Sequence, residues 1–177
     1  MRFSLSLILL PLVLFSCNNT VSQSKSEAEP ANEKATFYLI RHAEKQTGED
    51  PSLTAKGEQR AQYWADYFAD KDIDAVYSTN TTRTMQTATP TAEKLGLEIN
   101  QYDPASLYDE AFIKATEGKT ILVVGHTNTT ANLANKMLGE NQFQEIDDAQ
   151  FGKVFKITIS AGDADVEVKT LNSWSKE

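Results

Sequence analysis

The hydrophobic residues of this chain fall into short, separate runs that indicate alternating strands and helices. Three apolar, β-prone runs predict buried strands, at 36–40, 73–78 and 120–124. Helical spacing and end signals predict helices between and after them, at 55–69, at 82–95, at 103–117 and after 125–128 as far as Leu138. Two further runs, 154–159 and 166–171, predict an antiparallel pair with a turn at Gly162 and Asp163.

Residues with strong positional preferences mark several predicted helix ends. Thr54 can cap the first helix through its side-chain oxygen, and Gly96 and Gly139 each follow a helix where glycine commonly ends it. Pro90 lies inside the second predicted helix, where its missing N–H forces a kink or a restart. Asp103, followed by a proline, is interpreted as the cap of the third helix.

Strands that alternate with helices predict an α/β fold. We expect a three-layer αβα sandwich whose central sheet is mainly parallel, with an antiparallel edge near the C-terminus. In such sheets ligands bind beyond the carboxyl ends of the parallel strands. The segments that follow the three predicted strands are therefore where functional residues are expected.

The first 35 residues differ in composition from the rest of the chain. Residues 3–15 are almost wholly apolar and too short to span a bilayer comfortably, which favours a signal peptide over 1–16. Residues 14–17, Leu-Phe-Ser-Cys, resemble a bacterial lipobox, so Cys17, the only cysteine, is predicted to be lipidated. An ordinary signal peptide and an uncleaved anchor are the alternatives. The polar stretch 17–35 predicts a flexible tether, and 36–177 the folded domain.

This reading of the N-terminus predicts a lipoprotein of the cell envelope. It would be attached to a membrane through its lipid and would face the periplasm or the exterior. The net charge of −8 argues against a nucleic-acid-binding protein, which normally presents a basic face. An acidic chain can still bind a small anion, because a buried site sets its own local field.

The rare cationic and imidazole side chains gather at the expected edge of the sheet. Beyond Cys17 the chain has three arginines and two histidines, and four of these five fall in the segments that follow the predicted strands: Arg41, His42, Arg83 and His126. A neutral imidazole is a competent nucleophile near neutral pH, and arginine binds phosphate in a bidentate manner. The set indicates phosphoryl transfer. Two histidines without a further cysteine make a poor metal cluster, so neither a metal nor a cofactor is expected.

Four segments in order resemble the motifs of the histidine phosphatase superfamily, the phosphoglycerate-mutase-like proteins, and in particular its small phosphohistidine phosphatases. The segments are Arg-His-Ala-Glu at 41–44, Leu-Thr-Ala-Lys-Gly at 53–57, Tyr-Ser at 77–78 through Arg-Thr-Met-Gln-Thr-Ala at 83–88, and Val-Gly-His at 124–126. Each lies in the expected strand-to-helix context. The resemblance spans about 37–139.

The resemblance implies a role for each residue of the set. His42 would be the nucleophile that becomes phosphorylated, and Arg41, Arg83 and His126 would bind the phosphoryl group. Water would then hydrolyse the phosphohistidine without a metal. The implied substrate is a phosphorylated small molecule or a phosphoprotein.

The sequence departs from the family pattern in two places. Ala43 stands where the family usually has glycine, which matters only if that position needs a positive φ. No carboxylate clearly matches the family's proton donor: Glu44 is the first candidate and Asp109 the second. Without a donor, the enzyme would need substrates with good leaving groups, such as phosphoramidates or acyl phosphates.

Three functions stay open from the sequence. The first is a small phosphatase with an open site. The second is a phosphate-recognising module of the same fold that is weak or inactive in turnover. The third is a phosphatase of envelope phospho-sugars, suggested by the signal peptide.

Arg60 is interpreted as part of a solvated helix face.

Overall fold

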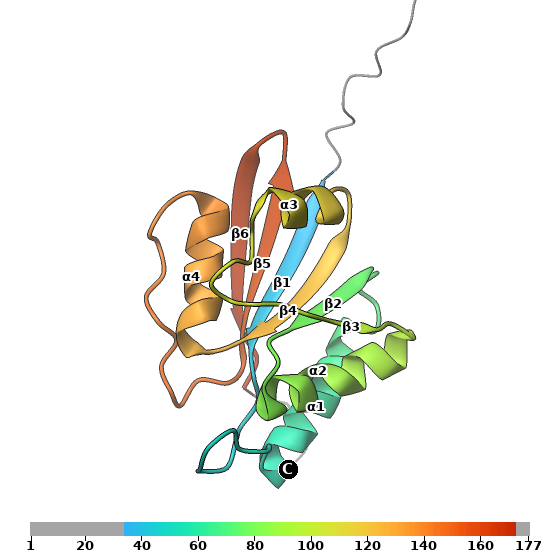
Figure 1. The fold of residues 1–177 in the computed structure, drawn as a ribbon, viewed down its shortest axis with the longest axis vertical. Coiled ribbons are helices and arrows are strands. Elements are labelled where there is room, and N and C mark those ends of the chain that lie inside the picture. The colour runs from blue at the N-terminus through green and yellow to red at the C-terminus, as the bar shows by residue number, and fades with distance from the viewer. Residues whose placement is uncertain (1–33, 173–177) are drawn as a thin grey trace, which may run out of the picture. The chain divides into compact units, whose positions relative to one another are not determined.

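The computed structural model describes residues 34–172, which form a mixed sheet with helices on both faces (Figure 1). The strands are β1 (Ala35–Arg41), β2 (Ala75–Ser78), β3 (Ile99–Gln101), β4 (Thr120–Gly125), β5 (Lys153–Ser160) and β6 (Asp163–Thr170). The helices are α1 (Ala55–Phe68), α2 (Thr82–Leu95), α3 (Glu110–Thr116) and α4 (Thr127–Leu138).

The six strands lie in the order β3-β2-β4-β1-β5-β6. The first four are mutually parallel, whereas β5 pairs antiparallel with β1 and β6 antiparallel with β5. The predicted α/β sandwich with a mainly parallel sheet and an antiparallel C-terminal edge is therefore confirmed. The most apolar strands, β1 and β4, lie at the centre, where both faces of the sheet are covered.

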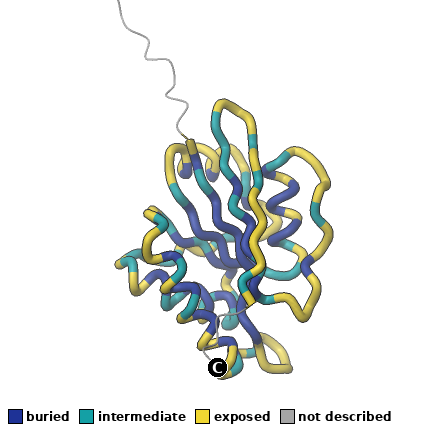
Figure 2. The backbone as a smooth tube through the Cα atoms, turned by 180° about the vertical axis from the view of Figure 1, so that it is seen from behind, coloured by how far each residue is buried: buried dark blue, intermediate teal, exposed yellow. Residues whose placement is uncertain are grey.

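Side chains that alternate along β1 and β4 divide the core into two layers. On one face, Tyr38 and Ile40 pack with Trp64 and Phe68 of α1 and with α2. On the other face, Phe37 and neighbouring strand residues pack with α3 and α4. Figure 2 shows the central strands as the most buried part of the backbone. The central strands are thus fixed from both sides, which makes their carboxyl ends a rigid platform.

Most of the predicted helix ends are confirmed. The Thr54 hydroxyl accepts a hydrogen bond from Gly57 N at 3.1 Å, so Thr54 caps α1 as expected. Gly96 and Gly139 end α2 and α4 in the left-handed conformation, with φ of 68° and 72°. Pro90 does not cause a restart, because α2 continues through it as one helix.

The predicted helix at 103–117 is wrong in its first half. Asp103 caps only a turn, in which its side chain accepts from Ala105 N and its carbonyl accepts from Leu107 N. Tyr108 then adopts a φ of 71°, which interrupts any helix, and α3 begins only after a second cap at Asp109. Asp103 and the proline after it therefore begin a single turn and not the predicted helix.

Three points of the predicted sheet also need correction. The three-residue edge strand β3 was not predicted, because so short a run carries no periodicity. The turn between β5 and β6 lies one residue earlier than expected, at Ala161 and Gly162, which both have positive φ as a tight hairpin requires. β1 begins at Ala35 rather than at 36.

The predictions for the N-terminus, including Cys17 and the signal peptide, lie outside the described residues. Within residues 34–172, no helix is both long enough and apolar enough to cross a membrane.

Candidate active site

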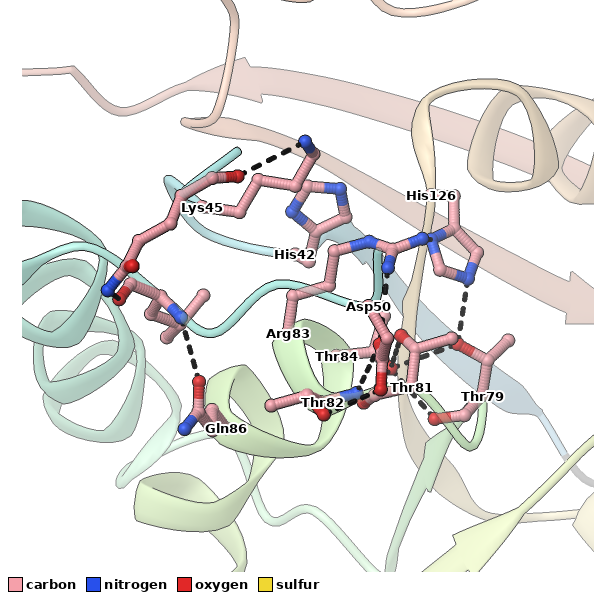
Figure 3. Close-up of polar contacts among 12 residues, drawn as sticks. His42, Lys45, Asp50, Thr79, Thr81, Thr82, Arg83, Thr84, Gln86 and His126 are labelled. Carbon is pink, nitrogen blue, oxygen red and sulfur yellow. Dashed lines mark hydrogen bonds and ion pairs between the residues drawn. The ribbon is translucent and has the colours of Figure 1, made fainter. Parts of the chain in front are cut away.

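The three segments singled out in the sequence meet at one edge of the sheet. Register pairs Arg41 of β1 with Gly125 of β4, and Val124 of β4 with Ser78 of β2, so the three carboxyl ends are level. His42 extends the ladder by one residue, since its N–H donates to the Gly125 carbonyl at 2.9 Å. Figure 3 shows the result: the imidazoles of His42 and His126 with the Arg83 side chain beside them. The two imidazole centroids are 5.8 Å apart.

His42 is almost fully buried, with 2% of the residue's surface exposed. Its Nδ1 lies 2.8 Å from the Ala43 carbonyl oxygen, which can only accept, so Nδ1 carries the proton. Nε2 is then left with its lone pair. Burial, opposed by that hydrogen bond and helped by the nearby arginines and His126, lowers the pKa of His42 to about 3. His42 is therefore neutral at pH 7, in the tautomer that a nucleophile at Nε2 needs.

The residue after His42 is held by α2. Ala43 N donates to the Thr87 hydroxyl at 2.9 Å, and that hydroxyl donates to the Arg83 carbonyl at 2.7 Å. The Ala43 methyl is buried against Leu53 and Ala61. Ala43 is not among the described residues with positive φ, so alanine fits where the family usually has glycine.

His126 is fixed by hydrogen bonds at both ring nitrogens. Arg83 Nη2, which can only donate, lies 3.2 Å from Nδ1, so the ring proton is on Nε2 and is donated to the Thr79 hydroxyl at 2.9 Å. Thr79 in turn donates to the Thr84 hydroxyl at 3.0 Å. Burial first, and then the charges of Arg83 and Arg41, lower the pKa of His126 to about 4. Both histidines are thus uncharged at neutral pH.

Arg83 reaches the site from the first turn of α2. Its Nη1 also lies 3.5 Å from Asp50 Oδ1, on the loop between β1 and α1. Asp50 accepts from Thr82 N at 2.9 Å and from the Thr82 hydroxyl at 2.6 Å, so it acts as the cap that Thr81 does not provide. These bonds lower the pKa of the Asp50 carboxyl, which keeps it ionised.

Arg41 is buried and is held by the loop that follows α4. Its Nη1 donates to the carbonyls of Asp147 at 3.2 Å and Asp148 at 3.0 Å, and its Nη2 lies 3.3 Å from the Asp148 carboxylate. The guanidinium also covers the Phe151 ring, 4.4 Å from its centroid. The same ring lies 6.2 Å from that of His42. The loop therefore fixes Arg41 and forms one wall of the site.

Both arginines keep an unused donor in this buried region. Arg41 Nε and Arg83 Nε are buried and have no hydrogen-bond partner. An unpaired buried N–H is costly and calls for a ligand. The two cations, the unpaired donors and the amino end of α4 next to His126 together favour an anion beside the His42 imidazole.

The two proton-donor candidates from the sequence are not placed with this group. Both Glu44 oxygens accept from Arg60, each at 2.8 Å, and Lys56 lies 3.6 Å away. Arg60 and Lys56 outweigh the opposing effect of burial and lower the pKa of the Glu44 carboxyl. An ionised carboxylate with both oxygens engaged is a poor acid, so the structure disfavours Glu44 as the donor.

Asp109 is also poorly placed to act as an acid. Its side chain caps α3 by accepting from Phe112 N at 2.8 Å. Residues of α3 share a cavity of about 430 Å³ with Ala35, at the amino end of β1, so α3 packs at the end of the sheet opposite to His42. Figure 1 shows α3 at that end. Asp109 is therefore remote from the site.

Several site residues were not found from the sequence. Arg60 was interpreted as solvated, but it is buried at 4% exposure as the partner of Glu44. Asp50, Asp148 and Phe151 were missed because they come to the site through tertiary contacts from loops without a motif. Thr79 lies within the segment 77–88 but was not singled out, because a threonine after a strand carries no signal of its own. Among the described residues no group of three or more His, Cys, Asp or Glu side chains could hold a metal ion.

Part of the chain, including three residues of this site, is similar to a known family of proteins. Residues 37–104 match the family model "Histidine phosphatase superfamily (branch 1)", a segment that contains Arg41, His42 and Arg83. The described domain is therefore similar to the histidine phosphatase superfamily over this segment, which is less than half of the chain. No curated protein matches the sequence.

Solved structures with the same fold include several phosphatases. A putative α-ribazole-5′-P phosphatase from Escherichia coli K-12 has a TM-score of 0.64 and 18% identity, covering 81% of this chain and 99% of its own. The putative phosphohistidine phosphatase SixA from Agrobacterium tumefaciens has a TM-score of 0.59 and 19% identity, and the match covers 77% of this chain and 98% of its own. A mycobacterial glucosyl-3-phosphoglycerate phosphatase has a TM-score of 0.62 and 12% identity, and the match covers 79% of this chain and 99% of its own. At these identities the likeness establishes the fold.

Proposed function

We propose that this protein is a phosphatase that works through a phosphohistidine intermediate on His42. The observation that carries the proposal is the state of His42: buried, neutral, with its proton held on Nδ1 by the Ala43 carbonyl and its Nε2 lone pair available. It lies in a site where Arg41 and Arg83 each keep a buried Nε donor without a hydrogen-bond partner.

Each residue of the site has a role in this reaction. Nε2 of His42 attacks phosphorus, and the bond to the leaving-group oxygen breaks. Arg41 and Arg83 bind the non-bridging oxygens, whose charge they balance in the transition state. His126 orients Arg83 through Nδ1 and lies beside the phosphoryl group. Water then attacks the phosphohistidine and releases inorganic phosphate. The reaction needs only positioning and charge stabilisation, which these groups supply.

Turnover of p-nitrophenyl phosphate and of a phosphohistidine substrate tests the proposal. The purified protein should hydrolyse both, and His42→Ala should lose at least about 1000-fold in kcat, because no other nucleophile replaces the imidazole. Glu58→Gln, an exposed change on α1, is the matched control and should retain full activity. Equal rates for the wild type and His42→Ala would refute the proposal.

One observation favours a second function, a phosphate-binding module without efficient turnover. Neither carboxylate expected from the sequence can act as the acid, since Glu44 is paired with Arg60 and Asp109 is remote. That module would bind vanadate or phosphate at Arg41 and Arg83 yet leave p-nitrophenyl phosphate intact. Vanadate binding without turnover would favour this binding module over the phosphatase.

The cellular location and the substrate are proposals that rest on the sequence. Cys17 and the apolar segment before it support a lipoprotein of the envelope, whose substrate would be an envelope-accessible phosphomonoester or phosphoramidate. Metabolic labelling with a radioactive fatty acid should label the wild type and not Cys17→Ser. A screen that includes glycan phosphates should show whether phospho-sugars are preferred.

A further inference from the structure

The proposed reaction lacks an identified proton donor. Among the carboxylates near the site, Glu44 is bound by Arg60 through both oxygens, and Asp50 is bound by Thr82 through both oxygens. Each is therefore held in its ionised form. Within residues 34–172, the remaining carboxylate in contact with a phosphate-binding residue is that of Asp148, which lies 3.3 Å from Arg41 Nη2.

The loop that carries Asp148 is anchored next to the site. Ile146 is buried at 2% exposure, and its N–H donates to the Thr127 carbonyl at the start of α4. Two residues further, the Asp148 carbonyl accepts from Arg41, and Phe151 packs beside His42. The loop around Asp148 is thus fixed to the start of α4 on one side and to Arg41 and His42 on the other.

The Asp148 side chain is held much more loosely than those of Glu44 and Asp50. Only Oδ1 is engaged, by Arg41 at 3.3 Å and by the Thr127 hydroxyl at 3.4 Å. The side chain is 91% exposed, while that of Arg41 is 4% exposed. Asp148 therefore lies where the site meets solvent.

The direction of attack places the leaving group on that solvent side. In phosphoryl transfer the attacking and leaving atoms are roughly in line across phosphorus. His42 is buried, so it attacks from within, and the leaving-group oxygen must lie opposite to it, towards solvent. A donor is thus required at the mouth of the site, where Asp148 lies.

We propose that Asp148 is the acid–base catalyst of the reaction, an inference that rests on the proposed phosphatase function. When a phosphate binds Arg41, its oxygens compete with the Asp148 carboxylate for the Arg41 guanidinium, which frees the Asp148 side chain to reach the leaving oxygen. As the His42 Nε2–P bond forms and the P–O bond breaks, the Asp148 carboxyl gives its proton to the leaving oxygen. In the second step the Asp148 carboxylate takes a proton from the attacking water, the N–P bond breaks, and phosphate leaves with the carboxyl protonated again.

The dependence of rate on the leaving group tests this role. An alkoxide leaving group needs the proton, whereas p-nitrophenolate departs with little help. Asp148→Asn keeps an oxygen that can accept from Arg41 but removes the acid. It should lower kcat/KM for an alkyl phosphate by about 100-fold and for p-nitrophenyl phosphate by only a few-fold.

Glu145→Gln is the matched control, an exposed carboxylate-to-amide change in the same loop, and should leave both rates unchanged. Equal losses on the two substrates in Asp148→Asn would mean that the residue only positions Arg41, and would overturn the proposal. So would a variant with wild-type rates on both, or a wild type that hydrolyses aryl but not alkyl phosphates. Failure of the phosphatase function itself is distinguishable, because the wild type would then hydrolyse neither.

Discussion

Arg83 Nη2 donates a hydrogen bond to His126 Nδ1 across 3.2 Å, so a cation faces the lone pair of a neutral imidazole. The bond explains why the second histidine is conformationally fixed without being charged. Arg83 sets the tautomer because it can only donate, and the other ring nitrogen donates to Thr79, which fixes the orientation of the ring. The site is therefore ordered before any phosphate arrives.

Thr79 is predicted to matter for catalysis although it carries no charge. In Thr79→Val the His126 Nε2–H loses its acceptor, so the imidazole is held at Nδ1 alone and its orientation is less fixed. We expect kcat/KM for p-nitrophenyl phosphate to fall about tenfold, the equivalent of one hydrogen bond. Thr79→Ser keeps the hydroxyl and should restore most of the rate. A serine variant as impaired as the valine variant would contradict this role.

The two histidines predict a pH dependence of stability. In the unfolded chain their pKa values return to about 6.5, whereas folding lowers them to about 3 for His42 and about 4 for His126. Below pH 6.5 the unfolded chain binds more protons, so the free energy of unfolding falls as pH falls, until the folded values are reached. Each histidine contributes up to about 1.4 kcal/mol per pH unit in that window.

Urea denaturation at several pH values measures this effect. Between pH 6.5 and 5 the wild type should lose stability more steeply than the double variant His42→Asn/His126→Asn. Parallel slopes for the two proteins would show that the histidines are not buried in their neutral form.

Glu44 is predicted to be structural. Glu44→Gln leaves the buried Arg60 guanidinium without its counter-charge and should lower the free energy of unfolding by about 3 kcal/mol. The ratio of rates on aryl and alkyl phosphates should stay at the wild-type value. Denaturant unfolding measures the stability, and assays on the aryl and alkyl phosphates measure the ratio of rates. Glu58→Gln, on the same helix as Arg60, is the control. A selective loss on alkyl phosphates at unchanged stability would instead make Glu44 the donor.

Asp50 is predicted to act on affinity through its charge. Asp50→Asn can still accept from Thr82, so α2 stays capped, but the negative charge 3.5 Å from Arg83 is gone. Vanadate should bind a few-fold more tightly at low salt, and the gain should disappear at high salt because the pair is exposed. Asp50→Ala should also lower Tm, since it removes the cap. Weaker vanadate binding by Asp50→Asn would show that the carboxylate is needed to order Arg83.

The sequence predicted those features that have local signals. The ends of β1, β2 and β4 could be read from apolar runs, so the meeting of Arg41, His42, Arg83 and His126 followed from the α/β fold. The prediction of one helix over 103–117 was wrong because Tyr108 adopts a left-handed conformation. No sequence pattern indicates such a conformation when the residue is not glycine. The Glu44–Arg60 pair was missed because partners 16 positions apart are joined only by the packing of α1 against the loop.

Close packing explains one further glycine of the motif. A Cβ at Gly57 would lie 2.0 Å from the Glu44 carbonyl oxygen, a contact that no side chain can make. The glycine of the 53–57 segment therefore lets α1 approach the loop that follows His42. The requirement is visible only once the backbone is in place.

The phosphorylated intermediate tests the account most directly. The protein is mixed with ³²P-labelled p-nitrophenyl phosphate and quenched in base within the first turnover. The account predicts a label that is stable in base and labile in acid, located on the peptide that contains His42, absent from His42→Ala and present in Glu58→Gln. Turnover without a label on His42, or a label that persists in His42→Ala, would contradict it.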